Sequence, residues 1–482
     1  MDVTMVRVTA HEIVELTGAR LVCGPERRDV CGVAIDSREV GKDGLFVAFA
    51  GERVDGNDFV AAAIEAGAGA VAMTRDPDAA LVAQAQRAGV ALLRIEDGER
   101  FLQDLAAWWR GQLDAIVVGI TGSSGKTTTR TMCAAVLATR YKTHQNEANY
   151  NNLIGVPLTI LSCPADAEAL VVEMGMDHAG EIATLAAVAR PQIGLITNVG
   201  VAHIGILGSR QAIAAAKAEL VEALPATDAA AHVPSRVLLW GEDDFTDWIS
   251  DEVAAPRGVD VVRYGTDAAD AARATNIEVD EAGCASADFA LPSGATCHVS
   301  LAIPGVHNVR NALAAAALGD ELGIPAADIA DALEGVAPLK MHQQVLQAPG
   351  GFTLIDDSYN ANPDSMRLAL DVLCSLPGAR HVACVGDMGE LGEREGLLHA
   401  IIGAYAAAKP VDALVCVGEL SRETAEAARL MGMDPACVFE VADAAAAIPV
   451  LAGLAGPGDV ALVKASRSTG LDAVVAGVMV AC

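Results

Sequence analysis

The residues with the clearest chemical potential form one short stretch, Gly119 to Thr129, which reads Gly-Ile-Thr-Gly-Ser-Ser-Gly-Lys-Thr-Thr-Thr. The apolar run Ala115 to Val118 before it predicts a buried strand, and residues 130–137 after it predict a helix. Glycines between a strand and a helix let backbone N–H groups approach phosphate oxygens at the helix N-terminus. The stretch therefore predicts a phosphate cradle.

The cradle supplies both a charge and a hydroxyl. Lys126 offers a point charge to phosphate, and Thr127 offers a hydroxyl suited to Mg²⁺. The strict nucleotide-loop pattern has glycine where Ile120 stands, so this is a shorter Thr-Gly-x-x-Gly-Lys-Thr variant. The alternative, a polar turn with a surface lysine, does not explain the order of strand, loop and helix. We predict that a nucleoside triphosphate contacts Gly122, Ser123, Ser124, Gly125, Lys126, Thr127 and Thr128.

Polar residues also follow two later predicted strands. Glu173 ends the apolar run 169–173, and His203 comes shortly after the run 193–198. The carboxyl ends of parallel strands face the ligand crevice, so both side chains are expected near the nucleotide loop. A carboxylate there suits Mg²⁺. The alternatives are a helix cap for Glu173 and a hydrogen-bonded structural role for His203.

Lys217 lies among alanines on a predicted helix. Such a lysine is usually solvated. If it faces the crevice instead, it either pairs with a phosphate or has its amine modified to an acid that reaches the metal. The residues themselves do not separate these two explanations.

The last part of the chain has polar loops at predicted strand ends. Residues 355–365 and 386–392 each follow a strand, and a helix is expected to begin near Pro363. Lys464 and Arg467 end a later strand, where they could anchor a carboxylate or a phosphate. Adjacent polar loops of this kind are typical of a ligand-facing sheet edge.

Composition excludes several classes of function. The 482 residues require several domains, and 52% hydrophobic content indicates a folded protein. A formal net charge of −30 argues against nucleic-acid binding. No apolar run is long enough to predict a membrane span. The 11 cysteines are scattered singly, which indicates reduced thiols in a cytoplasmic protein rather than a zinc site.

Three α/β units are predicted, because strand and helix patterns alternate along the whole chain. Residues 1–113 form the first and residues 114–337 the second, whose largely parallel sheet continues into an antiparallel patch at 271–301. Residues 338–482 form a third unit with a doubly wound parallel sheet of the Rossmann type. The boundaries near 113 and 337 are not marked by linker composition.

These residues together resemble the Mur ligases, the ATP-dependent amino-acid and peptide ligases of peptidoglycan synthesis. The nucleotide loop, Glu173, His203 and Lys217 match the central domain of that family in order and spacing. The resemblance implies ATP and Mg²⁺ as cofactors, with Thr127, Glu173 and His203 holding Mg²⁺ and a carbamylated Lys217 assisting a second ion. It gives catalytic roles to Lys126, Lys217 and His203. It further implies that the nucleotide also contacts Asn308, Asn311 and Asp356.

Within the family, the match is closest to the member that adds D-alanyl-D-alanine to UDP-N-acetylmuramoyl-tripeptide. The segments 149–159, 356–366 and 386–392 carry this resemblance, and residues 36–38 resemble the uridine-nucleotide domain. It implies an acyl-phosphate route in the cytoplasm, with small-molecule substrates and no membrane insertion. A monomer is expected, although no sequence feature determines the oligomeric state. The implied substrate-binding residues are Asp36, Ser37, Arg38, Asn152, Tyr359, Asn360, Asn362, Lys464 and Arg467.

Two departures from the family pattern accompany the resemblance. Lys340 and His342 stand where relatives usually carry an arginine that approaches the nucleotide, and residues 144–148 look altered. Two other functions compete: a ligase that adds a diamino acid, and a nucleotide-binding protein that has lost catalysis. The sequence does not tell whether the tripeptide ends in diaminopimelate or lysine.

Overall fold

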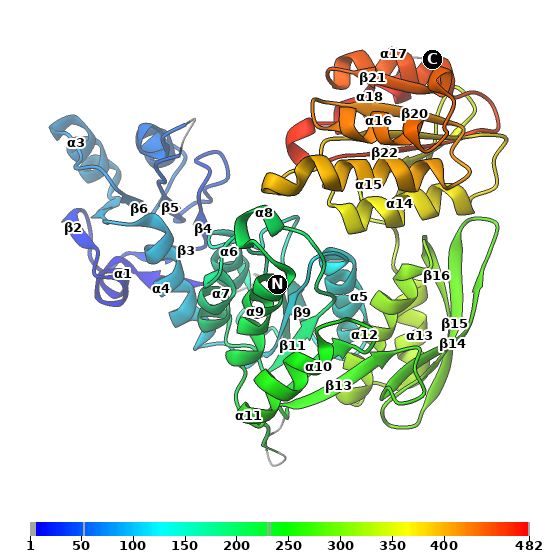
Figure 1. The fold of residues 1–482 in the computed structure, drawn as a ribbon. Helices are drawn as coiled ribbons and strands as arrows, with labels where there is room; N and C mark the ends of the chain where they lie inside the picture. Colours follow the sequence, from blue (N-terminus) through cyan, green and yellow to red (C-terminus); the bar gives the residue numbers. More distant parts are fainter. Residues whose placement is uncertain (1–5, 52–53, 229–230, 232, 481–482) are drawn as a thin grey trace.

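The structure is a computed structural model that describes residues 6–51, 54–228, 231 and 233–480. Three α/β parts follow one another along the chain, each built on its own sheet (Figure 1). The predicted three-part α/β fold is confirmed. Residues 1–5 and 481–482, which belong to the predicted first and third units, lie outside the described residues.

The N-terminal part has a five-stranded sheet in the order β2-β7-β6-β5-β4. Its strands β4 to β7 are parallel and β2 is antiparallel. The strands are β2 (Arg20–Cys23), β4 (Val33–Ala34), β5 (Leu45–Val47), β6 (Ala70–Met73) and β7 (Ala91–Arg94). The helices are α1 (Ala10–Thr17), α2 (Val60–Glu65), α3 (Ala79–Ala88) and α4 (Gly98–Arg110).

One N-terminal strand differs from its prediction. The pattern at 30–35 predicts a single strand, but the structure has β3 (Asp29–Cys31) and β4 in different sheets. Strand β3 pairs with β1 (Arg7–Thr9), whereas β4 joins the main sheet. The reason is Gly32, whose φ of +77° lies in the left-handed region and turns the chain between the two.

The central part has a nine-stranded sheet in the order β16-β15-β14-β13-β12-β11-β8-β10-β9. Only β14 to β16 pair antiparallel, which confirms the antiparallel patch. Strand β8 lies between β10 and β11, so the ends of all three strands meet at one edge. The strands are β8 (Ile116–Thr121), β9 (Thr143–Gln145), β10 (Ala169–Glu173), β11 (Ile193–Ile196), β12 (Arg236–Trp240), β13 (Asp260–Gly265), β14 (Ala272–Val279), β15 (Cys284–Ala290) and β16 (Thr296–Pro304).

Helices cover both faces of this sheet, because alternate residues of β8 enter different cores. Val118 and Ile120 pack with α5 (Lys126–Ala138), α12 (His307–Glu321) and α13 (Ala326–Glu334). Val117 packs with α6 (Gly155–Ser162), α7 (Glu181–Ala189) and α9 (Arg210–Glu222) in a core that continues into the other two parts. All six residues of β8 are buried, so the strand that carries the nucleotide loop is held from both sides. The shorter helical segments are α8 (Ile204–Leu207), α10 (Thr246–Trp248), a π-helical turn (Ile249–Ala254) and α11 (Ala255–Arg257).

The C-terminal part is a six-stranded sheet in the order β17-β18-β22-β19-β20-β21, in which only β17 is antiparallel. The apolar runs at 353–356, 381–385, 413–417 and 460–464 predict four strands of this part, and the structure confirms all four; β17 and β21 were not predicted. The strands are β17 (Gln344–Gln347), β18 (Thr353–Asp356), β19 (His381–Gly386), β20 (Ala413–Val417), β21 (Val438–Val441) and β22 (Val460–Lys464). The helices are α14 (Pro363–Ser375), α15 (Glu395–Ala407), α16 (Ser421–Leu430), α17 (Ala444–Leu454) and α18 (Asp472–Val480).

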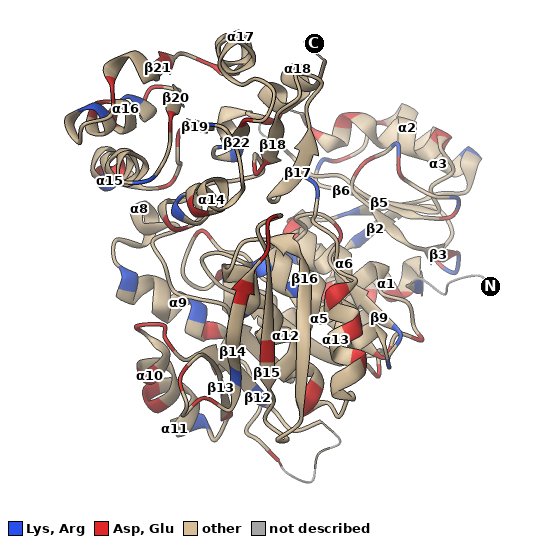
Figure 2. Cartoon of the chain, turned by 90° about the vertical axis from the view of Figure 1, so that its right-hand side faces the viewer, with Lys and Arg blue, Asp and Glu red and all other residues tan. Residues whose placement is uncertain are grey.

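The predicted boundaries fall between elements of different sheets. Helix α4 ends at Arg110 before β8, and α13 ends at Glu334 before β17, while the exact boundaries at 113 and 337 stay a prediction. None of the described helices is long and apolar enough to cross a membrane. Acidic positions are spread over helices, strands and loops of all three parts rather than gathered in one patch (Figure 2).

The contact between α15 and α16 gives a stability prediction. A Cβ atom on Gly403 would overlap the carbonyl oxygen of Thr424, whereas one on Gly453 of α17 would meet open space. We expect Gly403→Ala to lower stability by about 1–3 kcal/mol through overpacking. Gly453→Ala should raise it by about 0.5–1 kcal/mol, because alanine is the better helix former. Thermal unfolding of both variants checks this pair, and equal melting temperatures would contradict it.

Candidate active site

A cavity of about 720 Å³ lies between the central and C-terminal parts. Its walls bring together residues from β10, α5, α12, the loops after β11 and β18, and the end of β22. Most of the predicted site residues line it: Ser123, Ser124, Gly125, Lys126, Thr127, Thr128, Asn152, Glu173, His203, Asn308, Asn311, Tyr359, Asn360, Asn362 and Lys464. The described lining does not include Gly122, Lys217, Asp356, Arg467 or residues 36–38.

The nucleotide loop needs its two glycines for space and conformation. Gly122 has a φ of +154° and packs so closely on Thr197 that a Cβ atom would overlap the threonine hydroxyl. Gly125 has a φ of +77°, and a Cβ atom there would lie 2.8 Å from Asn311 Oδ1. The Nζ atom of Lys126 donates to the Gly122 carbonyl at 2.8 Å, which folds the cation over the loop. Burial lowers the pKa of Lys126, and Glu173 is the main charge that opposes this shift.

The loop after β11 fastens the nucleotide loop in place. The Asn198 side chain accepts from the Ser124 N–H at 3.1 Å and donates to the Ser124 carbonyl at 3.0 Å. The Asn198 carbonyl accepts from the Ser123 N–H at 3.0 Å. Sequence reasoning placed Asn198 at a strand end but gave it no role, because nothing in the pattern shows which neighbouring loop an asparagine amide will meet.

Glu173 ends β10 with its carboxylate held on both oxygens. Its Oε1 accepts from Asn151 Nδ2 at 2.8 Å and from Thr127 Oγ1 at 3.3 Å, and its Oε2 lies 3.3 Å from Arg130 Nη1. Glu173 is 1% exposed, so its carboxylate is enclosed by these partners. Paired oxygen ligands from Thr127 and Glu173 are the donors that Mg²⁺ prefers, and the pair fits such an ion.

Arg130 and Asn151 were missed by sequence reasoning. Arg130 lies one helical turn after Lys126 on α5, and this spacing is a signal that could have found it. Its guanidinium also donates to the Ala148 carbonyl at 3.0 Å. Burial lowers the pKa of Arg130, while Glu173 opposes the shift, so the two charges support each other in the interior.

His203 faces a second group of acids in the same cavity. Its Nδ1 atom lies 2.6 Å from Glu390 Oε2 and 3.3 Å from Asp177 Oδ1. The ligand atoms of these three residues lie within 4.8 Å of one another. The predicted Mg²⁺ ligands are therefore divided, with Thr127 and Glu173 in one cluster and His203 in another that includes a residue of the C-terminal part.

Lys217 lies on α9 and is 1% exposed. Burial lowers its pKa well below the ordinary lysine value, and the nearby charge of Lys126 lowers it further. A neutral amine is the form that reacts with carbon dioxide to give a carbamate. The structure is therefore compatible with carbamylation of Lys217. It gives less support to a direct contact between Lys217 and a phosphate, because Lys217 does not line the described cavity.

The depressed pKa of Lys217 predicts a pH dependence of stability. Between the folded and unfolded pKa values the unfolded chain binds more protons, so this group makes stability rise with pH, by at most about 1.4 kcal/mol per unit. We expect Lys217→Met to be more stable than the parent at pH 7. Its stability should lack the increase between pH 7 and pH 10 that Lys217 gives to the parent. Melting temperatures across that range measure the effect, with exposed Lys42→Met as the control. Parallel curves for Lys217→Met and the parent would contradict a depressed pKa.

The start of α12 forms another wall of the cavity. Asn308 donates to the Pro304 carbonyl at 2.7 Å, and Asn311 donates to Asn308 Oδ1 at 3.0 Å. Both asparagines are 2% exposed, and Asn311 touches the loop at Gly125. Burial lowers the pKa of the adjacent His307 to about 3, so its ring is neutral at physiological pH.

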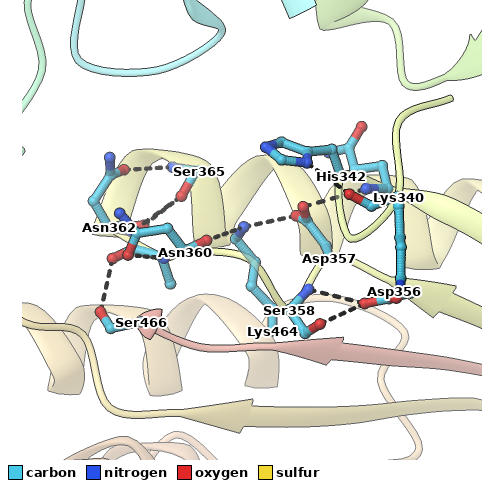
Figure 3. Close-up of polar contacts among 12 residues, drawn as sticks. Lys340, His342, Asp356, Asp357, Ser358, Asn360, Asn362, Ser365, Lys464 and Ser466 are labelled. Carbon is cyan, nitrogen blue, oxygen red and sulfur yellow. Dashed lines mark hydrogen bonds and ion pairs between the residues drawn. The ribbon is translucent and has the colours of Figure 1, made fainter. Parts of the chain in front are cut away.

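The predicted residues of the C-terminal wall differ in the polar contacts that they make (Figure 3). Lys464 Nζ lies 2.7 Å from Asp357 Oδ2 and donates to the Asn360 carbonyl at 2.8 Å, so its charge is already paired. Asp357 lines the cavity, whereas Asp356 accepts from the Ser358 hydroxyl at 2.6 Å and is 3% exposed. Burial raises the pKa of Asp357, and Lys464 opposes this shift.

The remaining predicted anchors lie apart from the cavity. Arg467 is 3.4 Å from Asp472, with most of its side chain in solvent. In the N-terminal part, Arg38 donates to the Asp36 carboxylate and lowers its pKa to about 2; Ser37 lies between them in sequence. Roles for these residues stay predictions.

The crossover segment between the central and C-terminal parts also reaches the cavity. Lys340 and His342 both line it. The His342 ring stacks on Tyr359, with centroids 4.7 Å apart and planes inclined by 24°. The segment that lacks the expected arginine therefore contacts the polar loop after β18.

Known proteins are similar to this chain in both sequence and architecture. Three sequence families match consecutive segments: the Mur ligase family catalytic domain at residues 29–110, the Mur ligase middle domain at 120–319, and the Mur ligase glutamate ligase domain at 341–467. The chain belongs to the Mur ligase family. The resemblance inferred from the motifs is thereby confirmed, and the molecule is a ligase.

Particular members of the family match nearly the full length. The UDP-N-acetylmuramoyl-tripeptide–D-alanyl-D-alanine ligase of Bacillus subtilis is 34% identical over 479 residues, covering 98% of each chain. A crystal structure of MurF from Acinetobacter baumannii has a TM-score of 0.86 at 30% identity and covers 99% of this chain and 100% of its own. MurF from Thermotoga maritima, solved in complex with ADP, has a TM-score of 0.76 at 25% identity and covers 93% and 97%.

Proposed function

We propose that this ligase joins D-alanyl-D-alanine to UDP-N-acetylmuramoyl-tripeptide at the expense of ATP, in cytoplasmic peptidoglycan precursor synthesis. The single observation that carries the proposal is the full-length match to relatives of that name. The intact nucleotide loop at Lys126 and Thr127 lines the cavity and is consistent with it. Cytoplasmic placement is supported by the ten described cysteines, all of which are free thiols. We expect a monomer.

Amide formation from a carboxylate requires activation. In the proposed reaction the tripeptide carboxylate attacks the terminal phosphorus of ATP, which gives an acyl phosphate and ADP. The amine of the dipeptide then attacks the acyl carbon, and inorganic phosphate leaves. Negative charge builds first on the phosphoryl oxygens and then on the tetrahedral centre, so preorganised positive groups stabilise both steps.

The cavity residues suit these demands. Lys126 and the backbone of residues 122–128 would bind the phosphates, and Asn308 and Asn311 would lie beside the adenine. Thr127 and Glu173 in one cluster and His203 in the other would hold Mg²⁺, which neutralises phosphate charge when bound. The amine substrate would enter from the C-terminal wall, near Tyr359, Asn360, Asn362 and Lys464. Asn152 lines the cavity from the central part, and Arg467 lies outside the described lining.

The uridine nucleotide would be recognised by the N-terminal part at Asp36, Ser37 and Arg38. Arg38 is exposed and Asp36 partly exposed, so a ligand can reach this pair without unfolding the part that carries it. The uridine nucleotide would therefore be bound at a place apart from the cavity in which the phosphate chemistry occurs.

A phosphate-release assay tests the proposal. The protein receives ATP, Mg²⁺ and the UDP-linked tripeptide, ending in diaminopimelate or in lysine, with D-alanyl-D-alanine, D-alanine or a diamino acid as the amine. We expect release only with the dipeptide. Preference for a diamino acid would assign the chain to the competing ligase activity, and nucleotide binding without release under every condition would indicate a protein that has lost catalysis.

A further inference from the structure

Glu390 extends from the C-terminal part to the histidine of the central part. It follows β19, and its carboxylate Oε2 lies 2.6 Å from His203 Nδ1. Its backbone carbonyl also accepts from the Gly205 N–H at 3.0 Å. Glu390 has a φ of +64°, a conformation that non-glycine residues rarely adopt. Two atoms of one residue therefore hold the segment that carries His203.

The two parts also pack closely against each other at the same place. A Cβ atom on Gly205 would overlap the Gly392 amide and lie 2.6 Å from the Leu391 carbonyl carbon. Gly205 is part of the short helix α8, and its backbone conformation is open to any residue. Glycine is therefore needed at position 205 to leave space for the C-terminal part, and not to allow an unusual backbone conformation.

The segment 197–205 contacts the nucleotide loop on its other side. The Gly200 N–H donates to Ser123 Oγ at 2.8 Å, and the neighbouring Val201 N–H donates to Asp364 Oδ2 of the C-terminal part at 3.0 Å. Asn198 binds Ser124, as described above. This one segment therefore links the phosphate cradle to the docked C-terminal part.

A carboxylate near a histidine ring affects the orientation and the protonation of that ring. A carboxylate on one ring nitrogen fixes the plane of the imidazole and the position of its proton, which determines the role of the other nitrogen. Among the described residues of the central part, Asp177 alone brings a carboxylate within ion-pair distance of His203 Nδ1, at 3.3 Å, and its side chain is largely exposed. Docking adds the nearer carboxylate of Glu390 at 2.6 Å, an ion-pair distance that lacks regular hydrogen-bond geometry at Nδ1.

We propose that Glu390 is a positioning residue for His203, so that the C-terminal part orients this histidine only when it docks on the segment 197–205. Catalytic competence is thereby coupled to docking through one interdomain contact. The inference rests on the proposed function for its kinetic consequence, but the contact itself can be tested without any substrate.

The spectroscopic test uses the full chain labelled with ¹⁵N-histidine. The 10 histidines give few side-chain signals, and His203→Gln identifies that of His203 by its loss. Glu390→Gln should shift the ring ¹⁵N signals of His203. Glu393→Gln, an exposed matched control in the next turn, should leave them in place. Unchanged His203 signals in Glu390→Gln would overturn the inference, whether or not the chain is active.

The kinetic test uses the same two variants and a steric one. We expect Glu390→Gln to lower kcat by about 10–100-fold with the dissociation constant for ATP within twofold of the parent. Gly205→Ala, which leaves every charge in place, should reproduce this loss, and exposed Ile206→Ala on the same helix should not. A parent-like kcat in Glu390→Gln, or an equal loss of ATP affinity, would overturn the inference. A parent chain that releases no phosphate would count against the proposed function alone.

Discussion

Lys126→Ala is expected to lower kcat for phosphate release by at least about 10²–10³-fold, the cost of removing one preorganised group that stabilises transition-state charge. The Nζ atom lies over the loop at 2.8 Å from the Gly122 carbonyl, at the place where phosphate oxygens would lie. Burial already disfavours its charged form, so the enclosed cation should be strongly stabilised by a bound phosphate. The coupled phosphate-release assay measures the loss.

The fold should survive this change. Lys126 is at the N-terminus of α5, where alanine is tolerated, and it makes no ion pair in the described structure. We therefore expect a melting temperature close to that of the parent. Lys42→Ala, in the N-terminal part, is the control for the loss of one positive charge. Full phosphate release by Lys126→Ala would disprove the role of the loop.

Glu173→Gln should have the second largest effect, with kcat reduced by about 100-fold and a raised Mg²⁺ requirement. The glutamine keeps the size of the side chain but loses the charge that Thr127, Asn151 and Arg130 surround. An amide is a weaker ligand for a hard cation than a carboxylate. Activity is measured as a function of Mg²⁺ concentration.

Glu168→Gln provides the matched control for this variant. Glu168 precedes the same strand at its opposite end and accepts from the Lys142 N–H at 2.8 Å, a bond that glutamine can also make. Its Mg²⁺ dependence should equal that of the parent. If Glu173→Gln shows the parent's Mg²⁺ dependence and only a lower melting temperature, Glu173 is a structural partner of Arg130 rather than a metal ligand.

Short-range patterns explain what the sequence could predict. The strand, the glycine loop and the helix at 115–137 are contiguous, and alternation in the third unit located four of its strands closely. Two edge strands there, β17 and β21, were missed, because half-exposed edges lack a continuous apolar run. The single glycine at position 32 was enough to divide one predicted strand between two sheets.

The sequence pattern could not predict contacts between segments that lie far apart in the chain. The pattern led to Asp356 as a nucleotide contact, but its carboxylate bonds Ser358 and the next residue, Asp357, lines the cavity. Strand alternation sends neighbours to opposite faces, and a one-residue difference decides which carboxylate reaches the ligand. Glu390 was read only as part of a loop motif, since its partner His203 lies far away in the chain.

The burial of β8 on both faces has a consequence for the dynamics of the cradle. Because β8 has hydrogen-bonded neighbours on each side and apolar cover above and below, its amides can exchange with deuterium only when the central part opens cooperatively. Edge strands such as β9 and β16 can fray without that cost. The phosphate-binding backbone is thus anchored to a strand whose amides we expect to exchange slowly, so that a displacement of the C-terminal part need not disturb the loop that would hold the nucleotide.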